Sequence, residues 1–223
     1  MNTQNRIEGR GSRADMHVHS AELEPIEIYE LARARGMDFV TITDQDSIAG
    51  VLQIAHLPGT FISEELIARF AGEPQPVQIL CYGINPQDHE WLRANRHDLE
   101  SCAEYLADRQ ITCALAAPCQ VAGASLAGGQ LRRLAQLFPI RETHHGDRLD
   151  ELGFPPSRYL ERGRGTVIGG SGGHAGTDIG RVYTETPPAA GPQEFLAHIR
   201  AGHADAHAAH GARAGEFMLL SRA

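Results

Sequence analysis

The stretch Asp15-Met16-His17-Val18-His19-Ser20 decides how the rest of the chain is interpreted. In a β-strand, side chains at positions i and i+2 project from the same face. On a strand, His17 and His19 would therefore point together into one cavity, which is how a strand offers two imidazoles to a metal ion. The stretch predicts a short first strand beside a metal site.

Strand-like and helix-like segments alternate along the chain after this stretch. Residues 37–43 are apolar and β-branched without alternation, which is typical of a strand covered on both faces. Further strands are expected at 60–66, 77–83, 111–116, 140–143 and 166–170, and helices at 25–35, 88–110, 130–138 and 193–201. Strands separated by helices predict βαβ units in a parallel sheet, and about seven such units favour an α/β barrel over an open sheet.

A length of 223 residues fits one domain, and no linker divides the chain. We expect an N-terminal tail at 1–12, a domain at 13–202 and a C-terminal tail at 203–223. Within the first tail, Ile7-Glu8-Gly9-Arg10 resembles a protease recognition sequence and carries no fold argument. The last tail contains histidines at helical spacing, which are more typical of a solvated segment than of a metal site: His203, His207 and His210.

The composition excludes several function classes. The net charge of −8 argues against a nucleic-acid backbone as partner. All 20 basic residues are arginine, which excludes Schiff-base chemistry, a P-loop lysine and a carbamylated lysine between two metals. The spacing of the 4 cysteines fits reduced thiols, and no apolar run reaches the roughly 18–20 residues that span a bilayer. We therefore expect a cytoplasmic protein without a membrane partner.

Further motifs stand at predicted strand ends, where α/β barrels carry their chemistry. They are Thr43-Asp44-Gln45-Asp46, Pro58 to Glu65, and Gly170-Ser171-Gly172-Gly173-His174. Together with Arg10 to Ser20 and Asp178-Ile179-Gly180-Arg181, they resemble the PHP (polymerase and histidinol phosphatase) family. The likeness is to its branch of small bacterial phosphoesterase-like proteins.

The resemblance implies a single distorted (βα)7 barrel whose strand ends hold divalent metal ions such as Zn, Mn or Mg. These ions would activate water against a small phosphate ester or nucleotide. By position, His17 and His19 match metal ligands, and Glu65 matches the catalytic carboxylate that bridges metals. His174 matches the histidine of the last motif, and Asp44 matches a catalytic aspartate that orients its neighbours.

Three positions depart from the family pattern, and each departure removes a ligand-type side chain. Gln45 and Ala117 stand where histidines are expected, and Gly172 stands where an aspartate is expected. Fewer ions than usual, or none, are therefore expected. One compensation lies in Glu142-Thr143-His144-His145-Gly146, because His145 could join His17, His19, Glu65 and His174 around a single ion.

Purely structural explanations of these candidate residues remain open as well. Glu64 is as available as Glu65, His174 could be an ordinary turn residue, and His144 and His145 could be solvated loop histidines. The sequence favours a PHP-type phosphoesterase whose activity is impaired. The alternatives are a catalytically inactive PHP scaffold that binds a ligand or partner, and another metal hydrolase of the amidohydrolase kind.

Overall fold

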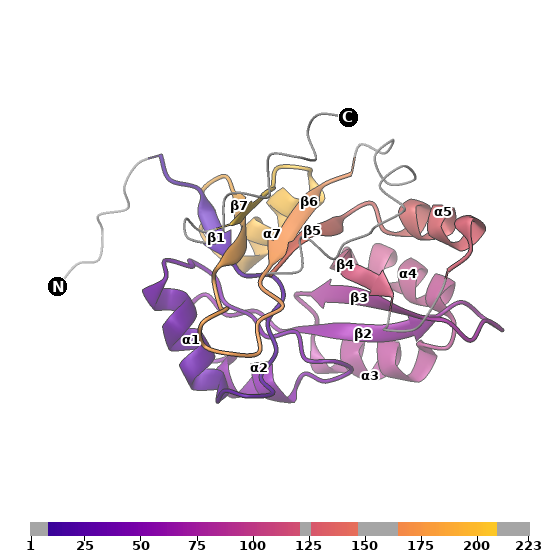
Figure 1. Ribbon diagram of the computed structural model, residues 1–223, viewed down its shortest axis with the longest axis horizontal. Coiled ribbons are helices and arrows are strands. Elements are labelled where there is room, and N and C mark those ends of the chain that lie inside the picture. Colours follow the sequence, from indigo (N-terminus) through magenta and orange to yellow (C-terminus); the bar gives the residue numbers. More distant parts are fainter. Residues whose placement is uncertain (1–8, 121–125, 147–164, 209–223) are drawn as a thin grey trace.

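The computed structural model describes residues 9–120, 126–146 and 165–208. Its helices are α1 (Pro25–Ala34), α2 (Ala49–Ile54), α3 (Pro86–Asn95), α4 (Leu99–Asp108), α5 (Gly128–Leu137) and α7 (Pro192–Arg200). Its strands are β1 (Ser12–Ala14), β2 (Ser63–Arg69), β3 (Pro76–Tyr82), β4 (Thr112–Gln120), β5 (Arg141–His145), β6 (Val167–Gly170), β7 (Val182–Thr186) and β8 (Asp205–Ala208). The fold is a mixed α/β arrangement (Figure 1).

The larger sheet has five strands in the order β2-β3-β4-β5-β6. Its β4, β5 and β6 run parallel, as the βαβ pattern predicts, but β2, β3 and β4 are antiparallel neighbours. The prediction of an all-parallel sheet is therefore wrong for this half. For β2 and β3 the reason is the connection, because a short turn around Gly72 joins them instead of a helix. Strands β3 and β4 are antiparallel although α3 and α4 connect them.

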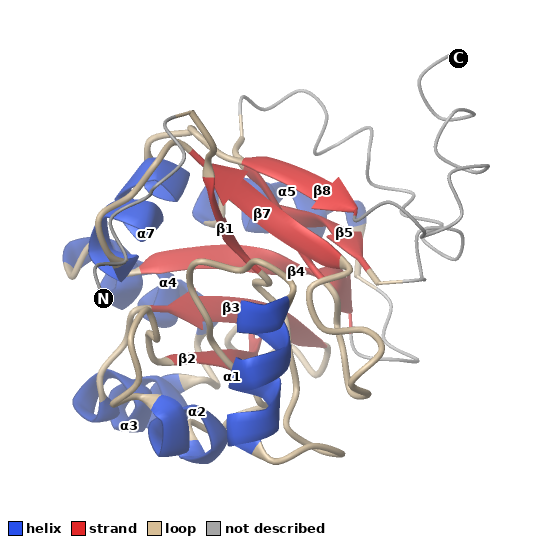
Figure 2. Ribbon diagram, turned by 90° about the vertical axis from the view of Figure 1, so that its left-hand side faces the viewer, coloured by secondary structure: helices blue, strands red, loops and turns tan. Residues whose placement is uncertain are grey.

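The smaller sheet consists of three antiparallel strands in the order β1-β7-β8. Its strands β7 and β8 lie against β6, the edge strand of the larger sheet, and Figure 2 shows α7 beside the smaller sheet. Strand β8 falls within the segment 203–223 that the sequence predicts as a tail, and residues 209–223 lie outside the described part of the chain. His203 and His207 are therefore not on a helix, and His207 stacks on Tyr183 of β7.

Two segments predicted as strands are irregular, with one isolated parallel bridge each, at Val18 and Val40. Both segments are still linked to the five-stranded sheet through backbone hydrogen bonds. The chain at 16–19 is linked to the turn after β6 (Gly172 N to His17 O, 2.8 Å) and to the segment 40–45 (Thr43 N to Val18 O, 2.8 Å). The latter segment is linked to β2 by Glu65 N to Asp44 O at 3.1 Å. No closed ladder of regular strands forms within the described residues, so the predicted (βα)7 barrel is not confirmed.

The helical pattern at 88–110 forms two helices rather than the single one that its periodicity predicts. Asn85 caps α3 by accepting hydrogen bonds from Gln87 N and Asp88 N, and Asp98 caps α4 by accepting one from Ser101 N. A capping aspartate has non-helical backbone angles, so Asp98 starts a new helix after α3 has ended at Asn95. Helix α2, with only six residues, was not predicted.

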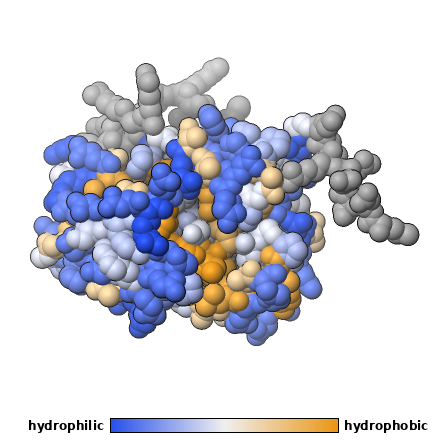
Figure 3. All heavy atoms as spheres, turned by 180° about the vertical axis from the view of Figure 1, so that it is seen from behind, coloured by the Kyte–Doolittle hydropathy of each residue, from blue (hydrophilic) through white to orange (hydrophobic). Residues whose placement is uncertain are grey.

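The buried apolar side chains form two clusters. The larger lies between the five-stranded sheet and helices α1 to α5, and includes Ile28, Leu66, Ile79 and Leu106. The smaller connects β1, β3 and α7 through residues such as Met16, Tyr82 and Phe195. The face opposite to that of Figure 1 is largely polar, with apolar atoms gathered near its centre (Figure 3). Among the described helices, none has the length and apolar character needed to cross a bilayer.

Candidate metal centre

Neighbouring glutamates on β2 point to opposite faces of the sheet. Glu65 pairs with Leu80 of β3, which belongs to the smaller core cluster, so its carboxylate faces the segment that carries His17. Glu64 pairs with Cys81 and contacts His89 of α3, with Glu64 Oε2 2.7 Å from His89 Nδ1. Of the two candidates that the sequence left open, Glu65 is therefore the one that lies beside the histidine pair.

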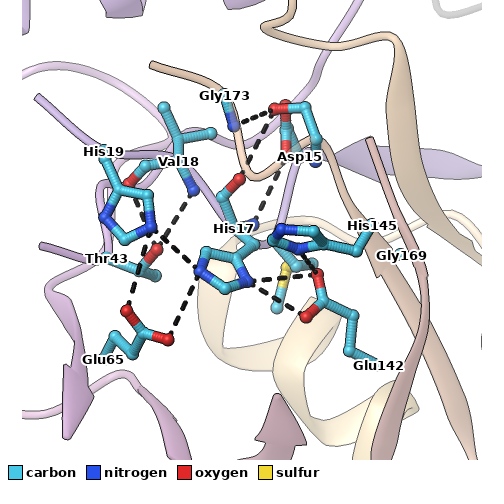
Figure 4. Close-up of polar contacts among 12 residues, drawn as sticks. Asp15, His17, Val18, His19, Thr43, Glu65, Glu142, His145, Gly169 and Gly173 are labelled. Carbon is cyan, nitrogen blue, oxygen red and sulfur yellow. Dashed lines mark hydrogen bonds and ion pairs between the residues drawn. The ribbon is translucent and has the colours of Figure 1, made fainter. Parts of the chain in front are cut away.

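His17 and His19 converge on the Glu65 carboxylate, as Figure 4 shows. Their Nε2 atoms are 3.1 Å apart. His17 Nε2 lies 3.7 Å from Glu65 Oε1, and His19 Nε2 lies 3.8 Å from Glu65 Oε2. All three side chains are buried, with relative exposures of 3%, 8% and 1%. The i, i+2 spacing thus brings both imidazoles to one place even though the backbone there is not a regular strand.

These residues fit a divalent cation. In a tetrahedral zinc site with Zn–N distances of 2.0–2.1 Å, neighbouring ligand atoms are about 3.3 Å apart, close to the separations around His17. Glu65 Oε2 is buried without a hydrogen-bond partner. A buried carboxylate oxygen without a partner is costly, and a bound cation would remove that cost. The ligand atoms of His17, His19 and Glu65 all lie within 4.8 Å of one another.

A second carboxylate, Glu142 of β5, holds the other side of the His17 ring. Its Oε2 and Oε1 atoms are 3.0 and 3.2 Å from His17 Nδ1. Its Oε1 is also 3.3 Å from Nδ1 of His145, which lies at the end of the same strand. A carboxylate on Nδ1 fixes the tautomer and orientation of a metal-ligating histidine. Glu142 is therefore placed to leave the His17 Nε2 atom for a cation.

The electrostatics follow from burial and from these contacts. Burial would lower the pKa of His17, but the charges of Glu142 and Glu65 outweigh it and raise the pKa to about 9. The same attraction overcomes the burial of Glu142 and lowers its pKa to about 2. Burial and the facing His17 lower the pKa of His19 to about 3. Protonated His17 therefore faces neutral His19, and a cation between the rings would take the place of the proton on His17 Nε2.

Asp15 connects the histidine segment to the loop that follows β6. Its carboxylate accepts hydrogen bonds from Ser171 N at 2.8 Å, Gly180 N at 2.7 Å and His17 N at 3.3 Å. Burial is the main influence on the Asp15 pKa and raises it to about 6, against these hydrogen bonds. Asp15 therefore sets the backbone position of His17 without facing the site itself.

Asp44 takes a supporting position rather than one among the ligand atoms. Its carboxylate accepts hydrogen bonds from Ser20 N at 2.7 Å and from Ser20 Oγ at 2.5 Å. Gly50 backs this pair, since a Cβ there would lie 2.5 Å from Asp44 Oδ2. The neighbouring Gln45 is exposed, and its side chain hydrogen-bonds to the Glu65 carboxylate. Gln45 therefore contacts the site, in a role different from that of a histidine ligand.

The remaining predicted residues lie around this centre. His174 is exposed and stacks on His19 with ring centroids 4.7 Å apart, but it is not among the converging ligand atoms. His145 packs edge-on against His17 with centroids 4.8 Å apart. Residue 117 lies on β4, and its side chain, like that of His144, is outside the described set.

Sequence reasoning missed the roles of Asp15 and Glu142. Both had a signal: Asp15 precedes the histidine pair, and Glu142 sits in the strand-end motif with His145. What the sequence lacked was the parallel pairing of β5 with β6, which brings that strand end to the histidines.

The chain is similar to known proteins in one stretch of its sequence and in its fold. A family model described as PHP-associated matches residues 158–204. No curated protein matches the chain. Among solved structures, PsfC from Pseudomonas syringae is similar at a TM-score of 0.63 and 13% identity, over 91% of this chain and 93% of that one.

Two further structures share the fold. A two-domain protein from Bacteroides vulgatus, described as containing a predicted PHP-like metal-dependent phosphoesterase, has a TM-score of 0.59 and 13% identity, over 88% of this chain and 64% of that one. An amidohydrolase from Chromobacterium violaceum, with bound sulfate and no metal, has a TM-score of 0.52 and 14% identity, over 87% and 97% of the two chains. The family-model match is confined to the C-terminal part of the chain, and the solved structures show a fold shared with a PHP-like protein, from the family that the motifs resemble.

Proposed function

We propose that the chain is a PHP-type phosphoesterase whose centre binds a divalent cation through His17, His19 and Glu65 and hydrolyses a small phosphate ester. The observation that carries the proposal is the convergence of two Nε2 atoms on a buried carboxylate with an unpartnered oxygen. The two-domain protein of similar fold, described as containing a predicted metal-dependent phosphoesterase, supports the same chemistry.

The chain's own residues have distinct tasks in this proposal. A bound cation would supply a Lewis acid that lowers the pKa of water and neutralises phosphate charge. His17, His19 and Glu65 would hold that cation, and Glu142 keeps the His17 ring in place. Exposed His174, stacked on His19, stands on the open side of the centre and can donate a hydrogen bond to a phosphate oxygen.

We infer reduced turnover compared with a site that has a full set of ligands. Gln45 contributes a neutral amide to the Glu65 carboxylate where a histidine ligand would contribute a metal bond. Gly172 contributes no side chain at all. These losses favour a single ion over a multinuclear centre. We also infer that the hydrogen bonds linking segments 16–19 and 40–45 to β2 and β6 form an irregular barrel around the site.

A second candidate function is a scaffold that binds a phosphorylated ligand without hydrolysing it. The observation that favours it is the Gln45 contact, which occupies part of the carboxylate that a cation would use. The fold of a protein that holds a sulfate without metal is compatible with this candidate.

One experiment tests the proposal and separates the candidates. Chelator-treated protein is titrated with Zn²⁺ and Mn²⁺, bound metal is measured by elemental analysis, and hydrolysis of p-nitrophenyl phosphate is followed with each ion. We expect about one ion per chain with slow turnover, and a loss of affinity of more than ~100-fold in His19→Ala, since even an outer-shell change costs 10–100-fold. His56→Ala, at an exposed histidine, is the matched control.

The outcomes are distinct. One ion without turnover would keep the cation site and refute the hydrolysis, whereas no ion and no turnover would favour the binding scaffold. The proposed cation site would be refuted if the protein takes up no ion. It would also be refuted if His19→Ala binds the cation as tightly as the parent does.

A further inference from the structure

One buried carboxylate holds both ends of the β6–β7 loop, residues 171–181. Asp15 Oδ1 accepts a hydrogen bond from Ser171 N at 2.8 Å, where the loop begins, and Oδ2 accepts one from Gly180 N at 2.7 Å, where it ends. Asp15 is only 3% exposed. A carboxylate can close a loop in this way because both of its oxygens are acceptors, whereas an amide of the same size has one acceptor end and one donor end.

Between these ends, the loop runs along the histidine segment and reaches toward α1, as Figure 1 shows. The carbonyl of Gly173 accepts a hydrogen bond from His19 N at 2.9 Å. Farther along the loop, the guanidinium of Arg35, which follows α1, donates to the carbonyl of Ile179. The loop is therefore anchored on both sides of His174.

His174 is the residue that this loop brings to the open side of the centre. Its side chain is exposed, whereas Gly173 before it is buried. The ring lies nearly parallel to that of His19, with an interplanar angle of 14° and centroids 4.7 Å apart. Because His19 covers one face of the ring, the backbone of the loop sets where the ring nitrogens point. A shift of the loop would therefore move the donor that the proposed function offers to a phosphate oxygen.

The contacts of Asp15 favour an action on the loop over an action on the cation ligands. Its hydrogen bond from His17 N is 3.3 Å long, which is longer than its two bonds from the loop. The His17 ring is held separately, because Glu142 Oε2 lies 3.0 Å from His17 Nδ1. Loss of the Asp15 charge should therefore disturb the loop more than the position of His17 Nε2.

We propose that Asp15 is a positioning residue for phosphate recognition, because it closes the β6–β7 loop and thereby places His174 over the centre. The inference rests on the proposed function and deepens it. It assigns the binding of the phosphate group to the loop, and the binding of the cation to His17, His19 and Glu65. The affinities for phosphate and for the cation should therefore be separable by substitution.

Asp15→Asn is the variant that separates the two affinities. The asparagine oxygen can still accept from Ser171 N and His17 N, but its NH₂ group then faces Gly180 N, so this end of the loop loses its acceptor. Zn²⁺ affinity is measured against a chromophoric chelator, and binding of inorganic phosphate to the Zn²⁺-loaded protein is measured by calorimetry. Hydrogen exchange followed by mass spectrometry reports on the loop amides without any ion.

A double-mutant cycle with His174→Ala supplies the readout that a merely structural role of Asp15 would not change. We expect Asp15→Asn and His174→Ala each to weaken phosphate binding about tenfold, while the Zn²⁺ affinity stays close to that of the parent. The double variant should bind phosphate no more weakly than His174→Ala alone. Amides at the Gly180 end of the loop should exchange faster in Asp15→Asn than in the parent.

Two further variants complete the design. Asp88→Asn is the matched control, because it removes a similarly buried charge on α3, which accepts from Asn85 N at 3.0 Å, and should lower stability without changing phosphate binding. Arg35→Ala removes the donor to Ile179 O and tests the loop at its other anchor. It should also weaken phosphate binding more than Zn²⁺ binding, and it keeps the test decisive if Asp15→Asn does not fold.

The results that overturn the inference differ from those that overturn the proposed function. The inference is refuted, and the cation site stands, if Asp15→Asn or Arg35→Ala binds phosphate as tightly as the parent or loses Zn²⁺ affinity to the same extent. It is also refuted if the loop amides exchange at the parent rate in Asp15→Asn, or if the effect of Asp15→Asn persists in full in the His174→Ala background. A parent that binds Zn²⁺ but no phosphate refutes the inference as well. If the parent binds neither, both proposals fail.

Discussion

At the scale of single residues, Glu64 and Glu65 show what the sequence can predict about a site and what it cannot. The period of two predicts that adjacent side chains point to opposite faces, but it does not say which face holds the site. That choice depends on the register of β2 against β3, which pairs Glu65 with Leu80 and Glu64 with Cys81. The histidine pair, by contrast, was predictable, because its spacing alone brings His17 and His19 together.

Glu64 should give stability a dependence on pH. Burial raises its pKa above the ordinary 4.5 despite the contact with His89. As the pH rises above about 4.5, the unfolded chain loses this proton before the folded protein does, so the native state loses stability across that window. The free energy of unfolding of the parent, relative to that of Glu64→Gln, should therefore be highest at low pH and should decrease as the pH rises.

Urea unfolding of both proteins between pH 4 and 7 measures this difference. Glu104→Gln, at an exposed position on α4, controls for the removal of one negative charge. A difference between the parent and Glu64→Gln that stays constant across this range would contradict the expectation.

At the scale of elements, the split of 88–110 into α3 and α4 has a physical reason. Apolar periodicity continues across the break, because the polar residues at 96–98 could also lie on the outer face of one helix. The capping signal of Asp98 was the stronger one. Capping side chains act on the backbone directly, whereas periodicity reports only which face is buried.

Asp88 should be the most sensitive position in this helix pair. Its buried carboxylate accepts hydrogen bonds from Asn85 N at 3.0 Å and Tyr105 Oη at 2.8 Å, and it pairs with Arg109 at 2.7 Å. We expect Asp88→Ala to lower the free energy of unfolding by about 1–3 kcal/mol, because it leaves these donors without their acceptor.

The measurement is urea or guanidinium unfolding. The control is Gln87→Ala, one position earlier and exposed, which should change stability by less than about 0.5 kcal/mol. Equal effects of the two changes would show that the carboxylate does not join α3 to α4.

At the scale of the whole molecule, the sequence predicted the α/β class but not how the strands pair with one another. Segments 15–20 and 37–43 carry strand-like residues, yet each makes only an isolated bridge. Side-chain pattern reports burial, and both segments are buried. Regular pairing also depends on neighbours far away in the chain, such as the turn at Gly173, which no local pattern specifies.

Tyr82 tests how strongly the sheet holds the histidine segment. Its buried hydroxyl on β3 donates to Met16 O at 2.9 Å, one residue before His17. Tyr82→Phe leaves that carbonyl without this donor and should lower the free energy of unfolding by about 1–2 kcal/mol. Tyr29→Phe removes a similar hydroxyl, which donates to Pro58 O at 3.0 Å at the surface, and should cost less than about 0.5 kcal/mol.

Equilibrium denaturation of the two variants makes the comparison. A surface variant as costly as the buried one would mean that the contact between β3 and Met16 adds no special stability.

Two buried thiols and one half-buried thiol can report on local opening of the elements that carry them. Cys81 on β3, Cys102 on α4 and Cys113 on β4 are free, and burial raises the thiol pKa of each, to about 12 for the last two. Because the thiolate is the species that alkylating reagents attack, each should react only when its own element opens. Iodoacetamide labelling at pH 8, followed peptide by peptide by mass spectrometry, should give rates far below that of a free thiol. If β3 and β4 open together, the labelling rates of Cys81 and Cys113 will match. The labelling rate of Cys102 on α4 can then differ from both.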